Sequence, residues 1–222
     1  MTILTRALIE ARLPLTVAAG AQPAAVPEAE LRRGMQGVLD QRQSADGIWV
    51  FAYGALIWEG DANDAARAGT VDGLVRRYCI WDNRNRGTVA QPALTLGLDR
   101  RPGACAGIAF HLAEDAVQEA LWNVWKQEMS GGYYTAEWVD VATEAGPVAA
   151  VTFVADPRHP LYAGALPESE IVGLLAAGVG PGGTAAGYLM QTADALRGWG
   201  IPDTGLDRYE AAVARRLGPE HG

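Results

Sequence analysis

The chain has 222 residues, and 49% of them are hydrophobic, which is ample for one domain with a filled core. Its formal net charge of -8 argues against nucleic-acid and anionic-membrane partners, which select basic surfaces. Its two cysteines, Cys79 and Cys105, provide neither a zinc-site spacing nor a disulfide framework, so buried free thiols are expected. The sequence contains no run of about 20 apolar residues, so no membrane-spanning helix is expected.

Residues 1–45 are expected to form an N-terminal extension with a helix. Residues 13–27 are rich in Ala, Pro and Gly and predict a loosely ordered lead-in. Pro27 then begins a helix that extends to about Gln41, with acidic residues in its first turn, where the helix dipole favours them.

The apolar residues after Arg12 weakly resemble the core of a secretion signal. Glu10 precedes them, however, and Pro14 interrupts them, so export is not expected. The expected location is the cytoplasm.

Residues 46–217 are predicted to form one α+β domain. Strands are expected at 48–53, 70–81, 93–98, 105–111, 134–142 and 147–154, and helices at about 113–129, 168–177, 184–198 and 205–217. A strand-rich middle with one inserted helix and a helical end favours α+β over a doubly wound parallel sheet.

The stretch from Trp49 to Trp58 is the first candidate for a functional segment. Its apolar and aromatic residues predict a buried strand, which leads directly into Tyr53 and Gly54. A glycine there allows a sharp turn and close approach to a ligand, so backbone N–H groups could face an anion or a carbonyl oxygen. The alternative interpretation is a plain hairpin corner.

Glu128 is the candidate proton carrier. On the helix predicted at 113–129, Val117, Leu121 and Val124 form an apolar stripe, and four further residues lead to Glu128. Burial disfavours a charged carboxylate, so a carboxyl group at this position suits proton transfer. The alternative is a carboxylate that reaches solvent or an arginine such as Arg76.

Three other sequence patterns are weaker evidence for a functional site. Three spaced glycines at 178–183 match a dinucleotide motif, but a helical segment precedes them and Pro181 removes a donor. The histidines, which lack metal-ligand spacing, are His111, His159 and His221. A basic cluster suits either a solvated strand edge or a bidentate carboxylate site, and its members are Arg76, Arg77, Arg84 and Arg86.

Four blocks in order resemble the ChaC-like branch of the γ-glutamylcyclotransferases. The first is Tyr53-Gly54-Ala55-Leu56, which resembles the Tyr-Gly-Ser-Leu loop of that family. The others are Arg76 to Leu96, Leu121 to Tyr134, and Tyr162 to Asp203. The resemblance covers roughly residues 46–217.

The resemblance implies a small barrel-like mixed sheet flanked by helices. It also implies an enzyme, a lyase that cyclises the γ-glutamyl group of glutathione to 5-oxoproline and releases Cys-Gly. Because the α-amine of the substrate is the nucleophile, neither a metal nor a cofactor is expected. The family match places the catalytic acid at Glu128, and the expected substrate-binding residues are Tyr53, Gly54, Ala55, Leu56, Arg86 and Tyr188.

The chain departs from the family pattern where substrate contacts are expected. Ala55 replaces the loop serine, Asn85 stands where His or Tyr is frequent, and Val89-Ala90 replaces Pro-Glu. Two alternatives therefore stay open. One is a cyclotransferase for another γ-glutamyl amine or dipeptide, and the other is a catalytically silent ligand-binding relative.

Overall fold

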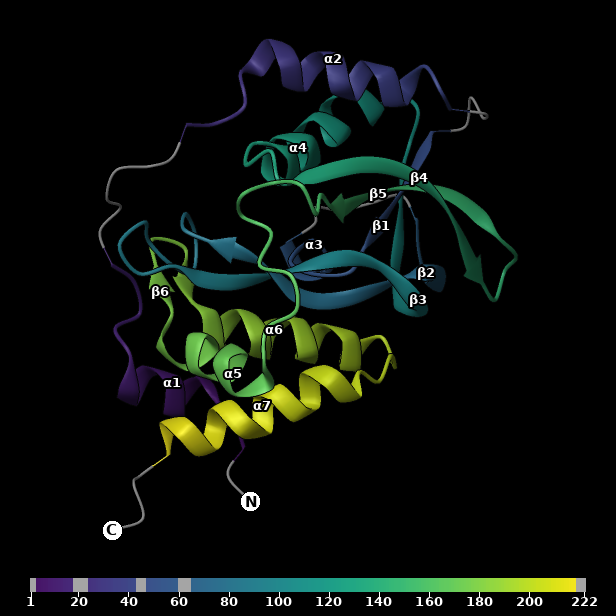
Figure 1. Cartoon of the computed structure of the whole chain (residues 1–222). Helices are drawn as coiled ribbons and strands as arrows, with labels where there is room; N and C mark the ends of the chain where they lie inside the picture. The colour runs from purple at the N-terminus through teal and green to yellow at the C-terminus, as the bar shows by residue number, and fades with distance from the viewer. Residues whose placement is uncertain (1–2, 18–23, 43–46, 60–64, 219–222) are drawn as a thin grey trace. The chain divides into compact units, whose positions relative to one another are not determined.

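The computed structural model describes residues 3–17, 24–42, 47–59 and 65–218 (Figure 1). Within these ranges, five strands close into a barrel in the order β1-β3-β2-β4-β5. Their bounds are β1 Ile48–Ala52, β2 Ala65–Asp82, β3 Ala93–Leu112, β4 Tyr134–Thr143 and β5 Val148–Ala155. The predicted α+β class and the small closed sheet are confirmed.

The barrel mixes antiparallel and parallel pairs. β1 pairs antiparallel with β3, with Ala52 opposite Ile108, and parallel with β5, with Val50 opposite Val151. β4 and β5 form an antiparallel hairpin. The side chains of Phe51, Ile108 and Val151 are fully buried, and the register places Phe51 on the face of the sheet opposite to that of Ile108 and Val151.

The prediction of two separate strands at 93–98 and 105–111 is wrong, because β3 is continuous. The intervening residues are polar and include Pro102, which resembled a loop. In the structure the Asp99 carboxylate accepts hydrogen bonds from Arg77 of β2 and from Arg101 Nε at 2.7 Å, which ties the two strands together. Gly103 has a φ of 140°, a conformation that lets the strand pass a local distortion.

The chain forms two compact units. The strand-rich unit comprises residues 24–77 and 97–160, and the helical unit comprises 1–23, 78–96 and 161–222. The strands β2 and β3 contribute residues to both units.

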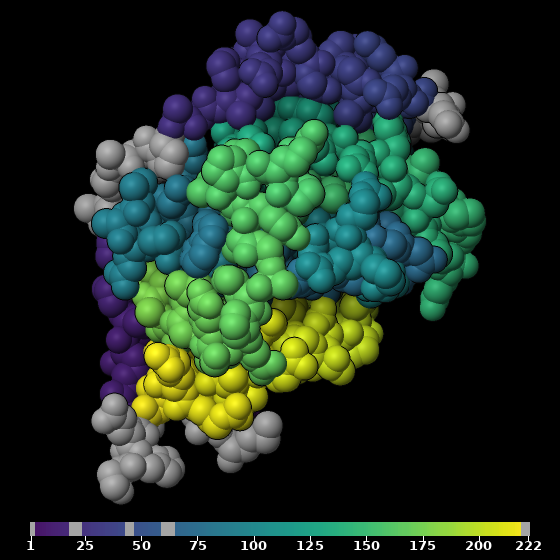
Figure 2. Space-filling view, in the orientation of Figure 1, coloured from purple at the N-terminus to yellow at the C-terminus, as the bar shows by residue number. Residues whose placement is uncertain are grey.

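In the strand-rich unit, helix α2 (Glu28–Leu39) packs on helix α4 (Val117–Met129), as Figure 2 shows. Gly34 of α2 lies against the Trp125 indole, since a Cβ there would be 3.1 Å from Cζ2. The predicted helix at 28–41 is confirmed. Helix α4 was predicted at 113–129 and begins four residues later. Residues Ala113–Ala116 form a turn before it, which is closed by the Ala116 N–H donating to Ala113 O at 3.0 Å.

In the helical unit, helices α5 (Glu168–Ala177), α6 (Ala185–Gly198) and α7 (Thr204–Leu217) pack together (Figure 1). They confirm the helices predicted after Pro160. Helix α1 (Arg6–Arg12), which contacts α6 and α7, was not predicted. Its signals are local: Thr5 caps it by accepting the Leu8 N–H at 3.2 Å, and Ile9 is buried.

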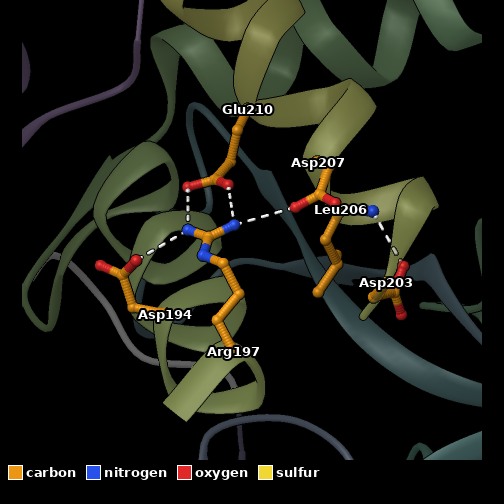
Figure 3. A network of polar contacts seen from close by, with 6 residues as sticks. All are labelled: Asp194, Arg197, Asp203, Leu206, Asp207 and Glu210. Carbon is orange, nitrogen blue, oxygen red and sulfur yellow. Dashed lines mark hydrogen bonds and ion pairs between the residues drawn. The ribbon is translucent and has the colours of Figure 1, made fainter. Parts of the chain in front are cut away.

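Arg197 joins α6 to α7 (Figure 3). Its guanidinium contacts Glu210 at 2.7 and 3.3 Å, Asp207 at 2.9 Å and Asp194 at 2.7 Å. Glu210 is buried, and this burial raises the pKa of its carboxyl group, although the hydrogen bonds from Arg197 lower it. The network therefore holds a partly desolvated carboxylate between the two helices.

In the part of the chain that the structure describes, no helix is both long enough and apolar enough to cross a membrane. Cys79 and Cys105 are buried free thiols, as predicted.

Candidate active site

The 53–56 loop connects β1 to a one-turn helix, α3 (Leu56–Glu59). The Ile57 N–H donates to Gly54 O and the Trp58 N–H to Ala55 O, both at 3.0 Å. Gly54 is buried and Ala55 half-buried. A strand, a glycine turn and a helix follow one another, so the alternative of a hairpin corner is wrong.

Arg76 holds the start of this loop. Its Nε donates to Tyr53 O at 2.7 Å, and its guanidinium also donates to Ala106 O on β3. A backbone carbonyl at the loop entry is thereby fixed to the barrel by a charge-assisted bond. Reasoning from the sequence missed this role, because Arg76 is 23 and 30 residues away from its two partners.

Tyr53 links the loop to α4 through β5. Its hydroxyl donates to the Phe153 carbonyl at 2.8 Å. The Phe153 ring meets the Trp125 ring edge-on, with centroids 5.9 Å apart and planes at 72°. Trp125 precedes Glu128 by three residues on α4, so one chain of contacts runs from the 53–56 loop to the helix that carries Glu128.

Glu128 is half-buried near the carboxyl end of α4. The buried face of this helix is formed by Val117, Leu121 and Trp125. The predicted stripe was therefore wrong at Val124, which is only half-buried, because the indole of Trp125 fills the core position. Lys126 and Gln127, which precede Glu128, are exposed.

Arg86 and Tyr188 lie in the helical unit, where the structure brings them together. Tyr188 is buried on α6 and meets the Tyr78 ring edge-on, at 6.4 Å between centroids. The Arg86 guanidinium carbon lies 5.6 Å from the centroid of the Tyr188 ring, and Arg86 also donates to Gly182 O. This geometry is a cation–π contact with a fixed arginine.

The glycine pattern at 178–183 is part of a small hairpin. Its strands are β6 (Val179–Gly180) and β7 (Gly183–Thr184), and they follow α5. A dinucleotide site needs a preceding strand and a following helix built around its glycines, so the motif is a chance match, as predicted.

The histidines make ring contacts. His111 meets the Trp49 ring at 4.9 Å, His159 meets the Tyr133 ring at 6.1 Å, and His221 lies outside the described residues. Among the residues that the structure describes, no three His, Cys, Asp or Glu side chains are grouped so that they could hold a metal ion.

The fold is that of a γ-glutamylcyclotransferase. A crystal structure of the yeast γ-glutamylcyclotransferase specific to glutathione superposes with a TM-score of 0.72 at 19% identity, over 80% of this chain and 100% of that one.

Sequence comparisons agree with the fold. The model of the ChaC-like protein family matches residues 48–216. The glutathione-specific γ-glutamylcyclotransferase of Escherichia coli K12 is 34% identical over 172 residues, which cover 77% of this chain and 74% of that protein. The glutathione-specific γ-glutamylcyclotransferase 1 of Mus musculus is also 34% identical, over 75% of this chain and 76% of that protein. The chain belongs to the ChaC-like protein family.

Proposed function

We propose that this chain is a glutathione-specific γ-glutamylcyclotransferase. The proposal rests on the activity named for its relatives and on one structural observation. The half-buried carboxyl of Glu128 stands on the helix whose Trp125 packs on Phe153, the residue that binds the Tyr53 hydroxyl of the 53–56 loop. A proton carrier and a turn rich in backbone N–H groups are thus held by one set of contacts.

The reaction needs a proton carrier and oxyanion donors, and the substrate supplies the nucleophile. Glu128 takes a proton from the α-ammonium of the γ-glutamyl group, and the freed amine attacks the γ-carbonyl carbon. The resulting oxyanion collapses, the C–N bond to cysteine breaks, and Glu128 returns its proton to the departing amine. The new ring nitrogen then gives up its second proton, which the released amine takes, so Cys-Gly leaves as an ammonium. The products are 5-oxoproline and Cys-Gly, and no water is consumed, which makes the enzyme a lyase.

The loop and the arginine have separate binding tasks in this proposal. Backbone N–H groups of Gly54, Ala55 and Leu56 stabilise the oxyanion or hold the glutamyl end of the substrate. Arg86 binds a substrate carboxylate. Arg76 is less suited to that task, because its guanidinium already donates to two carbonyl oxygens.

The two tyrosines have different tasks in this proposal. The Tyr53 hydroxyl donates its proton to Phe153 O, so its oxygen can only accept from the substrate, which suits the α-ammonium group. The buried Tyr188 ring supports the Arg86 guanidinium. No metal or cofactor takes part. We place the enzyme in the cytoplasm, where the glutathione pool is kept reducing.

A second candidate is a cyclotransferase for another γ-glutamyl amine or dipeptide. Ala55 removes a hydroxyl from the 53–56 loop, and Val89 is 59% exposed on the turn after Arg86, where the family carries Pro-Glu. Both changes remove polar groups that a tripeptide could contact.

Incubation of the purified protein with reduced glutathione tests the proposal, with γ-glutamyl-alanine in parallel. We expect 5-oxoproline and Cys-Gly in equal amounts and a higher kcat/KM for glutathione. A higher kcat/KM for the dipeptide would favour the second candidate. Release of no 5-oxoproline from either compound would contradict both.

A further inference from the structure

We propose that Asp82 is a positioning residue that fixes Arg86 in the orientation needed for substrate binding. The inference rests on the proposed function, in which Arg86 binds a substrate carboxylate. Neither the resemblance nor the sequence pattern assigned a role to Asp82, and the backbone N–H groups that its carboxylate binds belong, like Asp82, to the helical unit.

Asp82 ends β2 and is 7% exposed. Its Oδ1 accepts the N–H groups of Arg84 at 2.9 Å and of Asn85 at 2.8 Å, and its Oδ2 accepts the N–H of Arg86 at 2.9 Å. One buried carboxylate thus binds three consecutive backbone donors. Hydrogen bonds between a charged acceptor and N–H groups are about twice as strong as neutral ones.

The loop held by Asp82 is joined to the β6–β7 hairpin. The Gly182 N–H donates to Asn85 O at 2.8 Å, and Arg86 donates back to Gly182 O. Gly180 lies so close that a Cβ there would come within 2.2 Å of Asn85 O. Arg86 is therefore fixed at its backbone by Asp82 and along its side chain by Gly182 and the ring of Tyr188.

The fixed backbone determines where the guanidinium can go. A long arginine side chain has many rotamers, and preorganisation reduces the conformational entropy that is lost when it binds a carboxylate. If the three bonds to Asp82 are broken, the loop can move, and Arg86 must be reordered by each substrate molecule. The effect belongs to binding, so it should raise KM more than it lowers kcat.

The change Asp82→Asn tests this with almost no change in shape. Whichever way the amide is turned, its NH2 group faces at least one of the three backbone N–H groups, so the set of bonds cannot be kept. We expect the KM for glutathione to rise about tenfold, with kcat within about threefold of wild type. In Asp82→Ser the hydroxyl can hold only part of the loop, so the KM should lie between those of wild type and Asp82→Asn. If Asp82→Asn does not fold, a raised KM in Asp82→Ser tests the positioning role of Asp82.

A double-mutant cycle separates positioning from general stability. In an Arg86→Ala background, Asp82→Asn should change KM less than about twofold, because the residue that it positions is gone. The matched control is Asp203→Asn, which alters another carboxylate of the helical unit that accepts a backbone N–H, that of Leu206 at 2.9 Å. It should leave KM unchanged, since Asn is also a good helix cap.

Amide hydrogen exchange gives a readout independent of turnover. Peptides covering residues 84–87 and 180–184 should exchange faster in Asp82→Asn than in wild type, while 48–58 should not. Unchanged KM in a folded Asp82→Asn protein, or equal effects with and without Arg86, would overturn the role of Asp82 and leave the proposed function intact. A wild-type protein that is inactive on glutathione would instead overturn the proposed function, and this inference with it.

Discussion

At the scale of single residues, a chain of side-chain contacts connects the 53–56 loop to the helix that carries Glu128. The path runs from the Tyr53 hydroxyl through Phe153 to Trp125, one turn before Glu128. The carboxyl is half-buried, an environment in which it can exchange a proton with a bound substrate without being shut away from it.

The change Glu128→Gln keeps the shape of this side chain but removes its ability to accept a proton. We expect kcat for 5-oxoproline release to fall by roughly 10²–10⁴-fold, the usual effect of losing a positioned general base. Glutathione binding, measured by calorimetry, should persist, and the thermal midpoint should hold. Glu119→Gln, on an exposed position of the same helix, is the matched control and should leave kcat unchanged. Turnover of a folded Glu128→Gln protein at the wild-type rate would remove Glu128 from the mechanism.

Ala55→Ser tests how the 53–56 loop meets its ligand. Ala55 is half-buried, so a hydroxyl can be added there, and the backbone donors of the loop are untouched. We expect kcat/KM for glutathione to be preserved or to rise. A loss of more than about tenfold, in a protein that unfolds at the wild-type temperature, would show that Ala55 is adapted to a different ligand or to its packing.

At the scale of elements, α2 packs on α4, and two glycines of α2 face different surroundings. A Cβ at Gly37 would meet nothing within 4 Å, whereas one at Gly34 would lie 3.1 Å from the Trp125 ring. Gly37→Ala should therefore stabilise the protein by about 0.5–1 kcal/mol through helix propensity alone.

Gly34→Ala should gain less than Gly37→Ala, because the Trp125 ring must move to admit the methyl group. Urea unfolding of both variants beside wild type measures the difference. A larger gain for Gly34→Ala would contradict the packing of α2 on α4.

The Arg197 network gives α6 and α7 a pH-dependent contact. Burial raises the pKa of Glu210 above its ordinary value, so the folded protein binds this proton more tightly than the unfolded chain does. The stability that Glu210 contributes is therefore fully present below its ordinary pKa and is lost as pH rises through the raised value.

In Glu210→Gln the side chain at this position cannot titrate, so a comparison with wild type isolates the contribution of the Glu210 carboxyl to the pH dependence of stability. The free energy of unfolding of wild type minus that of Glu210→Gln should decrease as the pH rises from about 4 to about 7. Urea titrations at several pH values measure it. The control is Asp194→Asn, which removes a more exposed partner of the same Arg197. A difference that increases with pH would show that the ion pair outweighs the burial.

Sequence patterns predicted the longer elements well and the short or mixed ones poorly. The helices α5, α6 and α7 have clear starts and ends, and they were found almost to the residue. The one-turn α3 was missed, because its buried apolar residues continue the pattern of β1. The polar middle of β3 resembled a loop, since the Asp99 contacts that hold it are made with another strand and with a neighbouring arginine.

The residues around the site also divide into those with local sequence signals, which could be predicted, and those with partners distant in sequence, which could not. Glu128 and the 53–56 loop stood out because a carboxyl group near an apolar helix face and a glycine after a buried strand are local signals. Arg76 could not be found, because its partners are distant in sequence. Asp82 could have been found, since an Asp followed by Asn-Arg-Asn is typical of a turn closed by the Asp side chain.

At the scale of the whole molecule, the barrel and its helices are those of the γ-glutamylcyclotransferases, and the chain belongs to the ChaC-like family. In the proposed reaction the substrate cyclises on itself. A hydrolase built around the same carboxylate would instead activate water and release glutamate. The two reactions differ in the source of the oxygen atoms in the γ-glutamyl product.

Turnover of glutathione in water enriched in oxygen-18, followed by mass spectrometry of the products, tests this claim most directly. Cyclisation predicts 5-oxoproline without the heavy isotope, formed in equal amount with Cys-Gly, and loss of both products in Glu128→Gln. Glutamate carrying one oxygen-18 atom in place of 5-oxoproline would contradict the account.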